Sequence, residues 1–134
     1  MSEQRDIFSY IPQRPPFVFI DTIDERSEKC ARTHFTIPET CPLLSEGVLP
    51  LSGLMENAAQ TCSVIAGNRI AYLGAVKHME VTRFPHVGET LCTEAVVVQQ
   101  MLNISLIECI TRIHGEIIAT TTLKIATMDN NAAQ

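Results

Sequence analysis

The chain has 134 residues and a formal net charge of −5 at pH 7. This length fits a single domain, so we treat residues 1–134 as one unit. The acidic balance argues against a nucleic-acid-binding protein, because such proteins usually present a basic face.

The cysteines and the first residues indicate a cellular compartment. The five cysteines are an odd number without a C-x-x-C spacing, which is typical of small buried side chains in a reducing environment. The first ten residues, MSEQRDIFSY, carry charges where a signal peptide has an apolar segment. No apolar run approaches the roughly 20 residues of a transmembrane helix. We therefore expect a cytoplasmic protein without a membrane span.

The sequence lacks the usual motifs of metal-binding and phosphate-binding sites. No group of histidines and carboxylates has the spacing of metal ligands, and no glycine-rich phosphate loop occurs. We expect no metal ion and no cofactor.

The first third of the chain predicts a proline loop and two strands. Residues 11–16 contain three prolines, which favour a stiff extended loop over a helix. Residues 17–23 are β-branched and aromatic and predict a buried strand, followed by a polar turn at 24–27. Residues 29–37 alternate with period two and predict a half-buried strand. Its inward face is expected to carry Ala31, Thr33, Phe35 and Ile37.

Residues 50–66 carry a convincing amphipathic-helix pattern. Pro50 suits the first helical turn, and Gly67-Asn68 provides a stop signal. Apolar and polar side chains recur at spacings of three and four on two opposite faces. The apolar stripe contains Leu51, Met55, Ala58, Cys62 and Ile65, and the polar face contains Ser52, Glu56, Gln60 and Ser63.

Glu56 is the only charged residue between Glu46 and Arg69. A solvent-exposed helix face normally carries several Lys, Arg and Glu side chains. We therefore expect this helix to be wrapped by protein, with Glu56 placed where it does chemistry or contacts a ligand.

The second half of the chain predicts four strands, at residues 71–83, 89–99, 102–113 and 116–126, with a hairpin turn at His114-Gly115. In the last strand Ile117, Ala119, Thr121, Leu123 and Ile125 share one face. A polar tail follows at residues 129–134. One apolar helix and an antiparallel sheet indicate an α+β fold with the sheet curled around the helix. The open edges of such a sheet often pair in a dimer.

Three segments resemble the 3-hydroxyacyl-acyl-carrier-protein dehydratases. Residues 11–17, I-P-Q-R-P-P-F, with Asp21 after them, resemble the family's L-P-H-R-x-P-F…D opening. Residues 56–60, E-N-A-A-Q, resemble its E-x-x-A-Q helix motif, and residues 83–89 resemble a shortened R-F-x-x-P-V-x-x-G-D entry into the next strand. Residues 47–50, G-V-L-P, stand in place of a G-H-F-P-G loop, as in the subgroup associated with aryl-polyene pigment clusters.

This resemblance implies a hot-dog fold, in which an antiparallel sheet wraps one long helix. It also implies assembly as a dimer or a trimer of dimers, and action on acyl thioesters of acyl-carrier protein or coenzyme A in fatty acid or polyene synthesis. In the resembled enzymes a loop histidine is the base and the helix carboxylate serves the hydroxyl end. The corresponding positions are Gln13 and Glu56 as catalytic residues, and Gly53, Gln60, Phe17 and Arg14 as substrate-binding residues.

Gln13 stands at the histidine position of the motif and departs from it, because an amide cannot accept a proton near neutral pH. Among the four histidines, His78 is the least implausible replacement. Three hypotheses remain open: a dehydratase-like enzyme, a hot-dog thioesterase that uses Glu56, and a non-catalytic subunit. In the last case the chain forms a heterodimer with an active homologue, which supplies the missing histidine.

Overall fold

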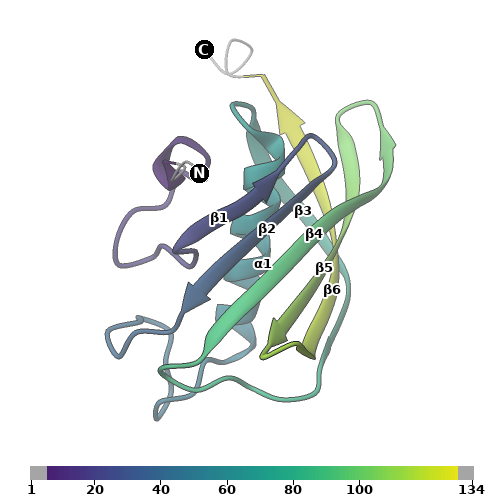
Figure 1. Cartoon of the computed structure of the whole chain (residues 1–134). Coiled ribbons are helices and arrows are strands. Elements are labelled where there is room, and N and C mark those ends of the chain that lie inside the picture. Colours follow the sequence, from purple (N-terminus) through teal and green to yellow (C-terminus); the bar gives the residue numbers. More distant parts are fainter. Residues whose placement is uncertain (1–5, 130–134) are drawn as a thin grey trace.

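A computed structural model of the chain describes residues 6–129 (Figure 1). Residues 1–5 and most of the predicted tail, residues 130–134, lie outside the described part. A helix, α1 (Leu51–Ala66), packs against a six-stranded sheet, and a short 3-10 helix, η1 (Ile7–Ser9), precedes the sheet. The strands are β1 (Thr22–Arg26), β2 (Cys30–Thr36), β3 (Ile70–Val81), β4 (Thr90–Met101), β5 (Ile104–Ile113) and β6 (Glu116–Met128).

The sheet has the strand order β1-β2-β4-β5-β6-β3, and every neighbouring pair is antiparallel. The strands curl around α1, which lies on the concave side (Figure 1). Strands β1 and β3 form the two edges. This arrangement confirms the predicted α+β hot-dog fold.

The core follows the predicted alternation in β2. Ala31, Thr33, Phe35 and Ile37 are all buried, as their period-two spacing predicts. The face predicted for β6 is right at its centre and wrong at its start, because Ile117 is exposed and Ile118 is buried. The β5–β6 pairing shifts its register at this point, because Thr111 pairs with Ala119 whereas Arg112 pairs with Ile117. A shift of one residue exchanges the two faces of a strand, which explains the error.

The strand predicted at residues 17–23 is wrong over most of its length. Residues 17–20 form no strand, and β1 begins at Thr22 and continues through the predicted turn to Arg26. Phe19 and Ile20 are buried, as expected for an apolar run. The backbone of Phe19, however, pairs with side chains of α1 and not with another strand. A buried apolar segment whose backbone partners are side chains has the same sequence pattern as a strand.

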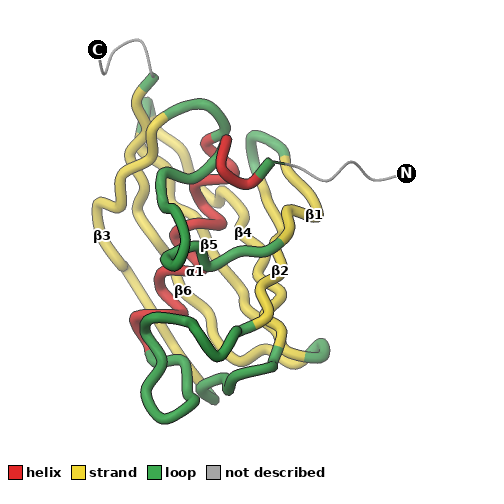
Figure 2. Tube along the Cα trace, turned by 90° about the vertical axis from the view of Figure 1, so that its left-hand side faces the viewer, coloured by secondary structure: helices red, strands yellow, loops and turns green. Residues whose placement is uncertain are grey.

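The predicted helix has nearly the observed bounds, but its buried arc differs from the predicted stripe. Leu51 is exposed and Met55 is only partly buried. Leu54 and Gln60, which the pattern did not place inside, are fully buried. The sheet covers one side of α1, and the loop after η1 runs alongside the helix (Figure 2). Because both the sheet and this loop contact α1, the buried part of the helix surface is wider than the predicted apolar stripe and is rotated relative to it.

Two further sequence-based expectations concern membranes and cysteines. Within residues 6–129 no helix has the length and apolar character needed to cross a membrane. All five cysteines are free thiols. Cys41, Cys62 and Cys109 are buried, as predicted, whereas Cys30 and Cys92 are only partly buried.

Candidate active site

The structure brings together Glu56 and Gln13, the two residues predicted to be catalytic. Glu56 lies in the second turn of α1 and is partly buried. Its Oε1 atom accepts hydrogen bonds from Nε2 of Gln60 at 3.0 Å and from Nε2 of Gln13 at 3.4 Å. Gln60 lies one helical turn after Glu56, whereas Gln13 belongs to the proline loop. One carboxylate oxygen is therefore held by two amide donors.

Gln60 holds this loop against the helix. Its side chain is completely buried. Its Oε1 atom accepts a hydrogen bond from the backbone N–H of Phe19 at 2.7 Å, and its Nε2 donates to the carbonyl of Phe17 at 3.0 Å as well as to Glu56. Each polar atom of Gln60 thus has a partner within the protein. This geometry favours an orienting role over contact with substrate, and the predicted role of Gln60 in substrate binding stays a prediction.

Gln13 presents a buried acceptor beside Glu56. Within the described residues, its Oε1 atom is shielded from solvent and has no hydrogen-bond partner. A buried polar atom without a partner costs about 1–3 kcal/mol, and such atoms normally meet a donor. The Oε1 atom of Gln13 can therefore accept one further hydrogen bond.

Gly53 lies in the first turn of α1, directly against Leu49. A Cβ atom on Gly53 would lie 2.3 Å from Cδ1 of the fully buried Leu49. The backbone N–H of Gly53 donates to the carbonyl of Pro50 at 3.0 Å. Close packing therefore accounts for a glycine here without a ligand, and the predicted role of Gly53 in substrate binding stays a prediction.

Arg14 braces the loop that carries Gln13. Its Nη1 donates to the carbonyls of Ile11 at 2.9 Å and Gln13 at 2.8 Å, and its guanidinium lies 4.9 Å from the centre of the Phe8 ring. Arg14 is exposed, and Phe17 is half exposed. Both are accessible to a ligand, and their predicted contacts with substrate remain untested.

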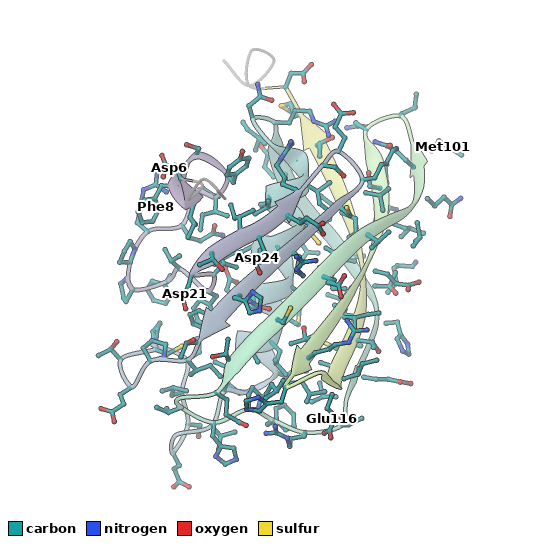
Figure 3. The ribbon with its side chains drawn as sticks, viewed as in Figure 1. Asp6, Phe8, Asp21, Asp24, Met101 and Glu116 are labelled. Atoms are coloured by element: carbon teal, nitrogen blue, oxygen red, sulfur yellow. The ribbon has the colours of Figure 1, made fainter. Side chains whose placement is uncertain are left out.

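Within the described residues, Glu56 forms hydrogen bonds with Gln13 and Gln60 and with no histidine. His34 bonds to Asp24, which is labelled on β1 in Figure 3. His78 pairs with Glu80 and lies opposite Thr122 of β6. The two neighbours of Thr122 along β6, Thr121 and Leu123, are buried and face inward. Because side chains alternate along β6, Thr122 and its cross-strand partner His78 face away from α1, and a register shift in β3 separates His78 from the inward-facing Val76. The structure therefore does not favour His78 as a replacement base.

The edge strand β3 leaves apolar side chains uncovered. Leu73 and Val76 lie opposite the buried Ile125 and Leu123 of β6, so they face the helix side of the sheet. They are nevertheless 46% and 38% exposed. One side of β3 also has no neighbouring strand within the described part of the chain. An unpaired edge with apolar side chains is a typical contact surface for another subunit.

Two buried polar residues of this region were missed by sequence reasoning. Asn57 donates from Nδ2 to the carbonyl of Phe19 at 2.8 Å, and the hydroxyl of Thr93 donates to Oδ1 of Asn57 at 2.7 Å. Thr93 could have indicated this buried network, because it is a polar residue at an inward-facing position of the strand predicted at 89–99.

The site combines a carboxylate, which can donate or accept a proton, with an amide, which can only hydrogen-bond. Such a carboxylate can protonate a leaving hydroxyl or activate a water molecule, and the unpaired acceptor of Gln13 lies beside it.

Comparison with known families gives one match over nearly the whole chain. The model of the ApeP-like family, described as ApeP dehydratase, matches residues 5–134. A comparison with curated proteins found no match.

Several solved structures share the fold at low sequence identity. A chain of the dehydratase heterocomplex ApeI:P from Xenorhabdus doucetiae is 16% identical with a TM-score of 0.85, and the alignment covers 96% of this chain and 95% of that chain. The Escherichia coli PaaI protein from the phenylacetic acid degradation operon is 17% identical with a TM-score of 0.69, with coverages of 78% and 80%. A hypothetical thioesterase with coenzyme A from Streptococcus pneumoniae is 9% identical with a TM-score of 0.70, with coverages of 80% and 84%.

Proposed function

Because the chain belongs to the ApeP-like dehydratase family, we propose that it takes part in the dehydration of 3-hydroxyacyl thioesters to trans-2-enoyl thioesters. The acyl group is carried by acyl-carrier protein or coenzyme A, and the reaction belongs to fatty acid or polyene synthesis in the cytoplasm. One observation carries this proposal: Glu56 lies against Gln13, whose Oε1 is a buried acceptor without a partner among the described residues.

Glu56 and Gln13 serve the hydroxyl end of the reaction. Dehydration requires a base that removes the C2 proton and an acid that protonates the departing C3 hydroxyl. Gln13 accepts a hydrogen bond from the C3 hydroxyl at its Oε1 atom and so places the C3 oxygen beside Glu56. Glu56 donates its proton to this oxygen, the C3–O bond breaks, and water leaves. The electron pair of the C2–H bond becomes the new double bond.

The proton acceptor for C2 comes from a second subunit. Gln13 and Gln60, the partners of Glu56 in the described residues, are amides and do not take up a proton. A second copy of this chain would bring the same residues, so a homologous subunit with a base is the better partner. The solved ApeI:P structure is a dehydratase heterocomplex, and the exposed apolar edge of β3 suits the pairing of two such sheets. We therefore favour a heterodimer, or a larger ring built from it, over a homodimer.

A second candidate function is thioester hydrolysis. A carboxylate without a histidine can activate water to attack the thioester carbonyl, which releases a carboxylic acid and a free thiol. Glu56 is such a carboxylate, and one structural neighbour is described as a hypothetical thioesterase.

The product distinguishes these functions. A 3-hydroxyacyl thioester on carrier protein, and the same acyl group on coenzyme A, are incubated with the chain alone and with its homologous partner. The products are separated by mass spectrometry. We expect the enoyl thioester from the mixture, and its loss with Glu56→Gln. Glu108→Gln is the matched control, because Glu108 is exposed on β5, outside the site.

Free thiol in place of enoyl product identifies the thioesterase and contradicts the dehydratase proposal. Unchanged enoyl formation by Glu56→Gln in the mixture assigns this chain to the non-catalytic role. Efficient dehydration by the chain alone contradicts the need for a partner.

A further inference from the structure

A chain of buried hydrogen bonds connects the centre of the sheet to the loop that carries Gln13. We infer that Asn57 and Thr93 are positioning residues, which set the placement of Gln13 and Glu56 by fixing the loop against α1. The activity consequence rests on the proposed function, whereas the structural consequence does not.

The chain of hydrogen bonds begins in the middle of the sheet. The Oγ1 atoms of Thr111 on β5 and Thr93 on β4 are 3.0 Å apart. Thr93 donates to Oδ1 of Asn57 at 2.7 Å, and Asn57 donates from Nδ2 to the carbonyl of Phe19 at 2.8 Å. A hydroxyl has one hydrogen, and Thr93 uses its hydrogen for Asn57, so Thr111 must be the donor to Thr93. The donors therefore run in one direction, from the sheet through the helix to the loop.

This direction fixes the orientation of the Asn57 amide, and the backbone of Phe19 fixes that of Gln60. If the amide of Asn57 were turned over, its oxygen would face the carbonyl of Phe19 and its nitrogen would face the donor Thr93. On the other side of Phe19, the backbone N–H requires an oxygen, so Oε1 of Gln60 must point to the loop. The Nε2 of Gln60 is then directed toward Glu56. The donor that contacts the carboxylate is thus fixed by the backbone N–H of Phe19, the residue whose carbonyl Asn57 holds.

The loop depends on these side chains because residues 17–20 form no strand. Buried backbone groups need partners, and both backbone polar groups of Phe19 find them on α1. Asn57, Gln60 and Thr93 are fully buried, and Thr111 is nearly so. A buried network whose members are all paired specifies one arrangement of the groups that it joins. Removal of one member should therefore release the loop before it unfolds the sheet.

The structure contains a matched control. The Oγ1 atoms of Thr33 on β2 and Thr61 on α1 are 2.9 Å apart, and both residues are fully buried at the same helix–sheet interface. Thr61 donates to the carbonyl of Asn57 and not to the loop. Thr33→Val and Thr93→Val each replace one buried inward-facing hydroxyl of a strand by a methyl group of similar size. Of the two, only the Thr93 change interrupts the path to Phe19.

The test is amide hydrogen exchange of the full chain, followed residue by residue by NMR. The amide of Phe19 donates to Gln60, so its exchange rate reports on the loop. We expect Thr93→Val to increase the exchange rate of Phe19 about tenfold relative to the amide of Ile107 in the central strand β5, as expected for a local opening. Thr33→Val should leave this ratio unchanged, and Thr93→Ser, which keeps the hydroxyl, should restore it.

An unchanged ratio in Thr93→Val, or equal changes in both valine variants, overturns the inference. If Thr93→Val does not fold, Thr111→Val takes its place. It removes the donor to Thr93, and we expect a smaller rise at Phe19, whereas no rise overturns the inference.

Activity gives a separate readout. In the heterocomplex, a misplaced loop should lower kcat roughly ten- to hundredfold with little change in KM, because positioning acts on the chemical step. Equal losses in Thr93→Val and Thr33→Val would assign Thr93 a merely structural role. If the native complex has no activity, the proposed function fails, and the exchange ratio still decides the inference.

Discussion

The Nε2 atom of Gln13 lies 3.4 Å from the Oε1 atom of Glu56, so a proline loop and a helix 43 residues apart in sequence meet at one carboxylate. The partner that this loop offers to the carboxylate is an amide. A site of this composition can hold a hydroxyl and transfer one proton, but it needs a second proton-transfer group for dehydration. This requirement connects the geometry of the site to the open edge of β3.

Gln13→Leu should separate stability from function. The change removes a buried acceptor that has no partner among the described residues, together with a long hydrogen bond of 3.4 Å to Glu56, so the melting temperature should change little. The proposed contact with the substrate hydroxyl is lost, and dehydration by the heterocomplex should fall. Calorimetry and the dehydration assay on one preparation check both parts. A lower melting temperature with unchanged activity would contradict the assignment of Gln13.

Gly53→Ala should destabilise the protein. The added Cβ would lie 2.3 Å from Cδ1 of Leu49, and Leu49 is fully buried and must shift. Overpacking of this kind typically costs about 1–3 kcal/mol. Urea unfolding measures the change in the free energy of unfolding. Ser52→Ala, at the exposed neighbouring position, is the control and should change stability by less than about 0.5 kcal/mol. A Gly53→Ala variant of native stability would favour a ligand-binding reason for this glycine.

The sequence predicts the fold of this chain well because β2, β5 and β6 each bury one face along most of their length. Ala31, Thr33 and Phe35 illustrate this point, since their period alone locates the inward face of β2. The error at Ile117 has a different origin, because no pattern marks the register shift that exchanges the faces.

The candidate site is predicted less completely. Glu56 is found because it is the single charge in an uncharged helix. Gln60 lies on the same face of the helix as Glu56, as predicted. Its complete burial is not predicted, because the loop that covers it is neither helix nor strand and has no period. The roles of Asn57 and Thr93 are missed for the same reason, because their network also leads to this loop. Side-chain to backbone contacts between distant segments leave no periodic signal.

Glu89 should titrate far below an ordinary glutamate. Two hydrogen bonds from the Arg83 guanidinium, at 2.9 and 3.0 Å, and one from the backbone N–H of His86 lower the pKa of Glu89 to about 2. Because the pKa is lower in the folded state, this pair stabilises the fold above the unfolded pKa of about 4.3, and the contribution is lost as the pH falls toward 2.

NMR titration of the Glu89 carboxyl measures this pKa directly. In Arg83→Gln it should rise toward the ordinary value, while Arg112→Gln, which breaks the separate pair with Glu94, should leave it unchanged. A pKa near 4.3 in the native protein would contradict the geometry of this pair.

Cys62 should be unreactive in the native protein. Its Sγ atom lies 3.6 Å from that of Cys109, and both side chains are buried between α1 and β5. The hydrogen bond with Cys109, together with burial, raises the pKa of the Cys62 thiol well above its usual value, and the thiolate is the reactive form. Alkylation followed by peptide mass spectrometry should label Cys30 first and Cys62 only after unfolding. Rapid labelling of Cys62 in folded protein would show that the helix–sheet interface opens.

The central claim is that this chain supplies Glu56 to a dehydration site shared with a homologous subunit. The most direct test is the single-turnover rate at which the assembled heterocomplex converts a 3-hydroxyacyl thioester to the enoyl product, with Glu56→Gln introduced into this chain alone. The account predicts that the variant complex still assembles and that its rate falls by roughly 10²- to 10⁴-fold, the usual contribution of a general acid. A variant complex that assembles and reacts at the native rate would contradict it.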